Sequence, residues 1–382
     1  MLLTVPHNPA DKVAQWAFLT AIATISLQWI PALGLPGAQV SDALFLVAGV
    51  AVLFSSHKLI RVARGDQAWL GLFVVGVVAS AVINGGSYIK LLGHLELVTV
   101  LLLAATLGQD QKIASRIKQA LIWMGILAAV TGLLGAVLYF AGCETRLLNH
   151  FGDLLPGNYP RVRGTCIKVN MLATIIATGL IMLWDEDKRT LLGRYRLIVT
   201  LLLLSGLLFT FSRTWLTVGC GLLALRALHT PGPRRVLLAT VSLVAVSALL
   251  LVSARYTISL DPTHFWQASI RSDPATRWVI WGDSLESLKA NPFWGKGPGS
   301  PATSSGWSAH LSWLNIWVVL GLAPLCAFVA GTYRVLVRYR FEMGAVVAVG
   351  VILLDGLARD VEDMRHLWVL MGLVLVPRPQ RT

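Results

Sequence analysis

Residues 116–142 read RIKQALIWMGILAAVTGLLGAVLYFAG, an apolar run whose only charged side chains stand at its start. Such a run is long enough to cross the hydrocarbon core of a bilayer, ~30 Å thick, as an α-helix. Similar runs recur along the whole chain, and the alternating pattern of a transmembrane β-barrel is absent. Charged residues make up 13% of the chain, whereas soluble domains have about 25%. The sequence therefore predicts an all-α polytopic membrane protein.

The apolar runs predict twelve transmembrane helices within one integral membrane domain that covers residues 1–382. They lie near 14–33, 40–54, 68–83, 91–107, 116–142, 168–184, 191–210, 214–229, 235–253, 309–330, 343–358 and 365–377. One long outer loop, residues 254–308, separates the ninth span from the tenth, and we expect it to carry short interfacial helices. The start of the chain precedes a run long enough to remain as a span, so no cleavable signal is expected.

The net charge of +13 would suggest a nucleic-acid partner in a soluble protein, but the distribution of the basic residues indicates a membrane topology instead. With both termini in the cytoplasm, the inner loops hold most lysines and arginines, as the positive-inside rule requires. The short outer loops hold the exceptions: Lys90, Arg146, Arg161, Arg163, Lys168, Arg213, Arg359 and Arg365. An arginine at the edge of an apolar run is costly to bury without a partner, so we expect several of these to bind an anionic substrate.

Two short segments place arginine and polar side chains where outer loops meet spans. The first, RVRGTCIKVN, carries Arg161, Arg163 and Asn170, and the second, FSRTW, carries Ser212 and Arg213. A guanidinium group can bind two phosphate oxygens at once, which lysine cannot. The alternative for the first pair is that they are interfacial arginines that extend toward the head groups. Arg213 has little room to reach water in its tight turn, so a functional role is favoured there.

The long outer loop contains the stretch RWVIWGDSLESLKANPFWGKGPG, which begins at Arg277. Its apolar positions, including Trp281, recur at i, i+3 and i+4 and predict a helix along the membrane surface. Asn291 and Pro292 end that helix, and Lys296 lies in the glycine-rich turn that follows. The turn lacks the spacing of a nucleotide-binding P-loop.

His310 stands where this polar loop gives way to the next apolar run. We expect it to open the tenth span, with Trp313, Leu314 and Trp317 on its own helix face at i+3, i+4 and i+7. An imidazole ordinarily titrates near pH ~6.5 and can accept a proton from a hydroxyl group at neutral pH. The alternative is a histidine that merely marks the membrane interface.

The last outer turn, GLARDVEDMRHLW, packs Arg359 and Arg365 among three carboxylates. It is either part of the substrate site or a loop that neutralises its own charges. Asp42 and Glu96, in or beside apolar runs, are either functional intramembrane carboxylates or, for Asp42, a plain helix N-terminus.

The four cysteines leave one question open. Cys143 and Cys166 flank an outer loop and either form a disulfide in an oxidising compartment or remain free. Cys220 and Cys326 lie in predicted spans and are expected to be packing residues. No Cys/His spacing indicates a zinc site.

In this order, the segments resemble the motifs of one family, the bacterial O-antigen ligases and Wzy-type polysaccharide polymerases. The matching residues are Arg163, Gly164 and Asn170; Ser212 and Arg213; Arg277, Trp281, Pro292, Phe293, Gly295 and Gly297; and His310, Leu314 and Gly321. The resemblance covers about residues 163 to 321. One position departs from the pattern, because Leu311 stands where the family usually has asparagine, and this leaves the acceptor in doubt.

The resemblance implies a GT-C-like fold and an inverting, metal-independent glycosyltransferase in the bacterial inner membrane, with no cofactor. Its donor would be a glycan on undecaprenyl diphosphate, presented at the periplasmic face. Arg213, Arg277 and Arg163 would bind the diphosphate, and His310 would be the general base. We expect further substrate contacts from Arg161, Asn170, Ser212, Trp281, Lys296, Trp313, Arg359 and Arg365.

The acceptor separates two functions within this family. It is the lipid A–core in an O-antigen ligase of lipopolysaccharide biosynthesis, which the motif set favours, and a second lipid-linked glycan in a polymerase. A secondary transporter or lipid flippase is the rival from another class, but no internal repeat is evident and the polar residues gather at one face rather than at the midplane. A membrane scaffold without chemistry is the third alternative.

Overall fold

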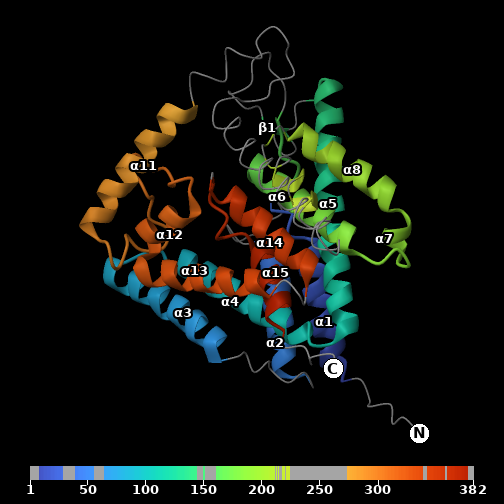
Figure 1. Ribbon diagram of the computed structural model, residues 1–382, viewed down its shortest axis with the longest axis horizontal. Coiled ribbons are helices and arrows are strands. Elements are labelled where there is room, and N and C mark those ends of the chain that lie inside the picture. The colour runs from blue at the N-terminus through green and yellow to red at the C-terminus, as the bar shows by residue number, and fades with distance from the viewer. Residues whose placement is uncertain are drawn as a thin grey trace, which may run out of the picture.

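Helices make up most of the described part of the chain (Figure 1). The computed structural model describes residues 8–28, 39–55, 64–143, 149–150, 161–210, 212, 214, 217–219, 221–223, 273–338, 342–357 and 359–376. Its helices are α1 Pro9–Ala23, α2 Val40–Leu53, α3 Arg64–Asn84, α4 Tyr88–Leu107, α5 Gln111–Phe140, α6 Val169–Asp185, α7 Leu191–Arg194, α8 Arg196–Phe209, α11 Asp273–Ala290, α12 Ser312–Leu320, α13 Leu322–Val337, α14 Met343–Asp355 and α15 Arg365–Leu375. Two strands of two residues each, β1 Asn149–His150 and β2 Arg161–Val162, pair antiparallel.

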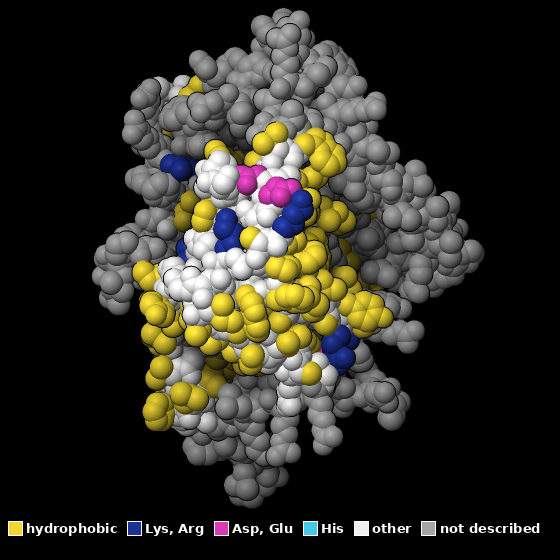
Figure 2. All heavy atoms as spheres, turned by 90° about the vertical axis from the view of Figure 1, so that its left-hand side faces the viewer, with side chains coloured by type: hydrophobic (Ala, Val, Ile, Leu, Met, Phe, Trp, Pro, Cys, Tyr) yellow, Lys and Arg dark blue, Asp and Glu magenta, His cyan; other side chains and the backbone are white. Residues whose placement is uncertain are grey.

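Three of the described helices are long and apolar enough to cross a membrane: Gly65–Asn84 within α3, α4, and α5. Six shorter described helices are also apolar, namely α2, α6, α8, α13, α14 and α15. Apolar side chains cover much of the face that carries α3 and α11, while most of its charged side chains lie in the upper half of the view (Figure 2). Val75 and Val82 of α3 and Ile89 of α4, for example, are more than half exposed. The structure is thus an all-α membrane architecture.

The helices pack in neighbouring pairs, with α1 on α2, α5 on α6 and α8, α4 on α15, and α3 on α13. The closest approach of α5 and α6 occurs at two glycines, because a methyl group on Gly125 would lie 2.9 Å from the Cα of Gly179. Small residues allow helix backbones to approach closely in this way, and such contacts are common between membrane helices. The largest fully buried side chains include Trp368, Phe18, Phe45 and Phe328.

Among the described residues, most predicted helices lie near where the hydropathy placed them, and the tenth predicted span is the clearest exception. The predicted span 235–253 and more than half of the predicted span 214–229 lie outside the described residues. Residues 309–330 do not form one helix, because α12 ends at Leu320 and α13 begins at Leu322. Gly321 between them has φ 96°, and a side chain there would overlap the carbonyl oxygen of Phe293. The Leu322 N–H donates to that same carbonyl at 3.0 Å. The loop before α12 therefore inserts into the helix and breaks it.

The glycine-rich turn packs so closely against the end of α12 that it requires glycine. Lys296 N and Gly297 N donate to the carbonyls of Val318 and Val319, both at 2.9 Å. Gly295 has φ 68°, and a methyl group there would lie 2.6 Å from the Val319 oxygen. The turn thus satisfies carbonyl groups at the C-terminal end of α12 that the helix itself leaves without donors.

The two cysteines that could have formed a disulfide are free thiols. Cys143 is exposed beyond the end of α5, whereas Cys166 is fully buried and its thiol donates to the Ser26 carbonyl at 3.5 Å. Burial raises the pKa of the Cys166 thiol. Cys166 therefore acts as a packing residue that ties the segment before α6 to the end of α1.

Candidate functional site

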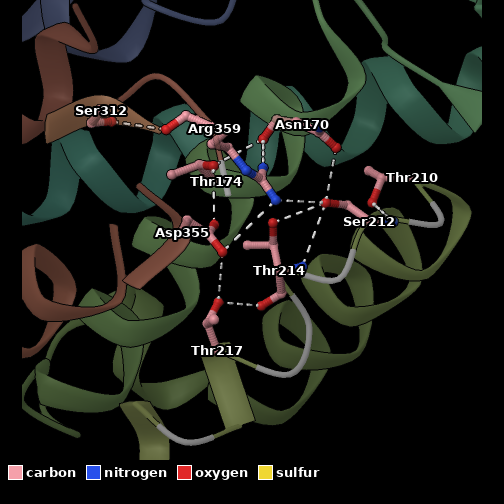
Figure 3. A network of polar contacts seen from close by, with 9 residues as sticks. All are labelled: Asn170, Thr174, Thr210, Ser212, Thr214, Thr217, Ser312, Asp355 and Arg359. Atoms are coloured by element: carbon pink, nitrogen blue, oxygen red, sulfur yellow. Dashed lines mark hydrogen bonds and ion pairs between the residues drawn. The ribbon is translucent and has the colours of Figure 1, made fainter. Parts of the chain in front are cut away.

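Arg359 is the centre of a polar network that joins three residues predicted from the sequence (Figure 3). Its Nη1 donates to the Asn170 carbonyl at 2.9 Å, and its Nη2 donates to the Ser212 hydroxyl at 3.3 Å. The Ser212 hydroxyl in turn donates to the Asn170 amide oxygen at 3.1 Å. Asn170 lies in the first turn of α6 and Ser212 lies just beyond α8. The network therefore connects two helices to the last loop before α15.

Asp355, the last residue of α14, is the member of this network that the sequence analysis missed. It is 4% exposed, and its Oδ1 lies 3.8 Å from Arg359 Nη2. The hydroxyls of Thr217 and Thr174 donate to its two carboxylate oxygens at 3.1 and 3.4 Å. A carboxylate at a helix C-terminus faces the negative end of the helix dipole, so the guanidinium and hydroxyl partners are needed there. The sequence feature that could have identified Asp355 is its position four residues before Arg359, the i,i+4 spacing of an ion pair.

The network also fixes the backbone on both sides of Arg213. Ser212 N donates to the Thr210 hydroxyl at 3.2 Å, and Thr214 N donates to the Ser212 hydroxyl at 3.4 Å. Thr210, Ser212 and Thr214 are all buried. Arg213 itself lies outside the described residues. Its neighbours are held by the same hydroxyl that accepts from Arg359.

His310 precedes α12 instead of opening it, which corrects the prediction that it shares a helix face with Trp313, Leu314 and Trp317. Its φ is 51°, and it is the one described non-glycine residue in the left-handed region. A side chain in that region costs about 1–3 kcal/mol, which the surrounding contacts must offset. The helix cannot include His310 because its backbone turns the opposite way there.

The imidazole of His310 faces a carboxylate from the last loop. Its Nδ1 lies 3.8 Å from Asp360 Oδ2 and 3.2 Å from the Ser308 hydroxyl. Burial raises the pKa of Asp360, while a hydrogen bond from Ser308 and the charges of His310 and Lys168 oppose that shift. Since the His310 side chain is 35% exposed, it can meet a ligand on one side and its carboxylate partner on the other. This pairing can stabilise an imidazolium ion.

Ala309, the residue before His310, has both of its backbone polar groups held by side chains of helices. Ala309 N donates to the Asn315 side-chain oxygen in α12 at 3.2 Å, and the Ala309 carbonyl accepts from Trp281 Nε1 in α11 at 3.0 Å. Asn315 Nδ2 continues the chain by donating to Glu362 Oε1 at 2.7 Å. Trp281 therefore holds the backbone next to His310, and the substrate contact expected of it from the sequence stays a prediction.

The two halves of the site meet in the loop between α14 and α15. Two consecutive residues of this loop contact the two halves. Arg359 binds the network of Asn170 and Ser212, and Asp360 faces His310. Ser312, at the start of α12, joins the loop to the helix by donating to the Arg359 carbonyl and accepting from Val361 N, both at 2.8 Å. This loop is therefore not self-neutralised, since its charges pair with other elements.

The remaining predicted site residues lie in different surroundings. Arg365 pairs with Asp42 at 2.7 Å and with Glu96 at 3.2 Å, which joins α15 to α2 and α4. Trp313 packs against Phe328 with ring centroids 5.3 Å apart. Asp42 also completes a capping box with Gln39 at the start of α2, which confirms its helix N-terminal position.

The other predicted cations are only partly described. Arg163 is half-buried directly after β2, where burial lowers its pKa. Lys296 is half-buried in the glycine-rich turn. Arg161 lies in β2 and Arg277 lies in α11, but their side chains fall outside the described part of the structure. Within the described residues, no group of three or more His, Cys, Asp or Glu side chains is placed to hold a metal ion.

Glu362 gives the site a pH-dependent contribution to stability. Burial raises the pKa of its carboxyl from the ordinary 4.5 to about 8, and the nearby charges of Asp360 and Asp363 add to the shift. The folded protein thus keeps the proton that the unfolded chain loses, so Glu362 makes folding less favourable as pH rises from about 4.5 to about 8. Above that pKa, the cost is constant.

We expect the Glu362→Gln variant to gain unfolding free energy relative to the native chain as pH rises through this window, by on the order of 5 kcal/mol in total. Thermal unfolding in detergent between pH 5 and 9 measures the difference. Glu286→Gln is the matched control, since that side chain is 68% exposed. A stability difference for Glu362→Gln that stays constant across this range would contradict the assignment.

No known family model and no curated protein sequence matches this chain.

Proposed function

We propose that this protein is a membrane glycosyltransferase that moves a glycan from undecaprenyl diphosphate to an acceptor hydroxyl, as the O-antigen ligases and polymerases do. One observation carries the proposal: segments far apart in the sequence, chosen for their resemblance to that family, meet in pairs. Asn170 in RVRGTCIKVN contacts Ser212 in FSRTW. Trp281, in the stretch that begins at Arg277, donates a hydrogen bond to the carbonyl of Ala309, the residue before His310. The last loop joins both pairs.

The first pair supports a site for the donor diphosphate. The Ser212 hydroxyl accepts from Thr214 N, which orders the residues that flank Arg213, and Arg213 remains the first candidate ligand of the diphosphate. Arg277 and Arg163 are the further candidates for diphosphate ligands. Guanidinium groups can stabilise the negative charge that grows on a leaving diphosphate, which a divalent cation does in many sugar-nucleotide enzymes.

The second pair supports a general base. In the proposed reaction, His310 accepts the proton of the acceptor hydroxyl as its oxygen bonds to the anomeric carbon. The bond between that carbon and the donor oxygen breaks, and undecaprenyl diphosphate leaves with the bonding electrons and with inversion at carbon. Asp360 faces the imidazole at 3.8 Å and would stabilise the imidazolium ion that forms. The His310 imidazolium then gives this proton to water, which restores the neutral imidazole.

The finer features of this proposal follow from topology and resemblance. The site would face the periplasm in a bacterial inner membrane, with about twelve spans in a GT-C-like arrangement and both termini in the cytoplasm. The acceptor would be the lipid A–core in a ligase or a second lipid-linked glycan in a polymerase. The chain offers no residue that separates these two acceptors.

Purified protein in detergent tests the proposal directly. Undecaprenyl-diphosphate-linked glycan is supplied with lipid A–core, with excess lipid-linked glycan, or with both, and the products are separated by size. We expect one acceptor to gain the glycan. Lack of transfer to either acceptor, together with movement of the lipid-linked glycan across liposome membranes that contain the protein, would contradict the proposal and favour a flippase.

A further inference from the structure

The backbone of His310 is controlled by a residue that no motif singled out. Asn315 lies one turn into α12, and its side-chain oxygen accepts from Ala309 N at 3.2 Å. Ala309 is fully buried, so this hydrogen bond does not compete with water. The Ala309 carbonyl, which belongs to the next peptide group, accepts from Trp281 Nε1. The two contacts thus hold the peptide groups on both sides of Ala309, and the second of these peptide groups adjoins φ of His310.

The orientation of the Asn315 side-chain amide depends on a second residue. Its oxygen faces Ala309 N, so its NH₂ group must face the other way, where Glu362 Oε1 accepts at 2.7 Å. The second Glu362 oxygen accepts from Val361 N at 3.0 Å. Trp368 Nε1 of α15 donates to the Glu362 carbonyl at 2.8 Å. Glu362 is therefore held on three sides and can fix the amide of Asn315 in one orientation.

Glu362 also determines where the carboxylate partner of His310 lies. Asp360 is two residues earlier in the same loop, and the bond from Val361 N to Glu362 fixes the peptide between them. One buried glutamate thus acts on His310 twice. It reaches the backbone through Asn315 and the imidazole through the position of Asp360.

We propose that Asn315 and Glu362 form a positioning pair that holds His310 in its left-handed conformation, facing Asp360, for the proposed glycan transfer. The inference rests on the proposed function. Neither residue touches the reacting atoms, so both act through His310. The pair explains why the last loop carries a buried glutamate that is 7% exposed and has no guanidinium partner among the described contacts.

A double-mutant cycle tests the pair, because its hydrogen bond can be reversed. The variants are compared at pH 9, where the Glu362 carboxyl is ionised and both of its oxygens accept hydrogen bonds. In Glu362→Gln, an NH₂ group must then face either Asn315 Nδ2 or Val361 N, and in Asn315→Asp two carboxylates face each other. Combining the two changes restores a donor and an acceptor, since the introduced glutamine then donates to the introduced aspartate, which still accepts from Ala309 N. The swap therefore rebuilds the geometry with the opposite polarity.

We expect each single variant to lower kcat by ~10²-fold, the size of effect that a small misplacement of a catalytic group produces, with KM within about twofold of the native value. The swap should recover most of that loss. A purely structural brace would instead lower the amount of folded protein without changing the turnover of each folded molecule. Native kcat in both single variants, or a swap no more active than either, would overturn the proposal.

A second readout separates this inference from the proposed function. The rate at which diethyl pyrocarbonate modifies His310, followed by mass spectrometry at the same pH of 9, reports the surroundings of the imidazole without any substrate. We expect the rate to change in both single variants and to return toward the native rate in the swap. If native protein transfers no glycan but this pattern holds, the function is wrong and the positioning pair stands. If the rate is the same in all four proteins, the pair is wrong.

The single variants replace buried groups, so one of them can fail to fold. Trp281→Phe then supplies the test, because it removes the N–H that holds the Ala309 carbonyl from the opposite side and keeps an aromatic ring. We expect it to change the modification rate of His310 as well. An unchanged rate in Trp281→Phe would show that the clamped peptide does not control His310.

Discussion

Replacing His310 with asparagine is expected to lower kcat for glycan transfer by about 10²–10⁴-fold, the usual contribution of a general base. Asparagine is the informative replacement because it tolerates a positive φ better than alanine does. The native φ of 51° can therefore persist in the variant. The loss should then reflect proton transfer and not a rearranged backbone.

Initial rates with purified protein, at saturating donor and acceptor, measure this effect. His94→Asn is the matched control, because His94 is a second histidine, near the start of α4, whose Nδ1 contacts only the Lys90 carbonyl of its own helix among the described hydrogen bonds. We expect that variant to keep a rate close to native. A His310→Asn protein that transfers glycan at the native rate would remove His310 as the base.

Replacing Arg359 with leucine is expected to cost about 3–5 kcal/mol of unfolding free energy, because Asp355 is then a buried carboxylate without its cationic partner. Arg359 side-chain donors also satisfy the Asn170 carbonyl and the Ser212 hydroxyl. Their loss should release the backbone around Arg213 and lower transfer by at least ~10²-fold. Thermal unfolding and initial rates measure the two effects separately.

The double variant Arg359→Leu with Asp355→Leu separates stability from function. It removes the buried charge together with its partner, and such replacements of buried ion pairs by apolar residues are often neutral or stabilising. We expect most of the lost stability to return while transfer remains low, because Ser212 and Asn170 are still without the guanidinium. Recovery of activity along with stability would mean that Arg359 serves only to neutralise Asp355.

The positions of the helices could be predicted from the sequence because one requirement determines them, the satisfaction of backbone hydrogen bonds inside a membrane. A run of apolar residues in a membrane must satisfy its backbone internally, and a helix does so. The prediction near 40–54 matches α2 and the prediction near 343–358 matches α14 within three residues. The break at Gly321 could not be predicted in this way. It depends on the Phe293 carbonyl, and Phe293 is distant in the sequence.

Part of the candidate site could be predicted for a related reason. Asn170, Ser212 and Arg359 are polar groups at the edges of apolar runs, where an unpartnered side chain is costly, and the structure shows them as one another's partners. The same argument does not locate Asn315 or Glu362, because their importance lies in the direction of an amide and in contacts between separate loops. The helical position of His310 was wrong, since its backbone is set by Asn315 and Trp281.

The central claim is that the protein breaks the bond between a glycan and undecaprenyl diphosphate by transferring the glycan to a hydroxyl group. Its most direct test is the stoichiometry of the two products in the presence of excess chelator, with released undecaprenyl diphosphate and newly glycosylated acceptor measured in the same sample. The account predicts equal amounts of both products, unaffected by the chelator. Intact lipid-linked glycan with no released undecaprenyl diphosphate, or a reaction that the chelator stops, would contradict it.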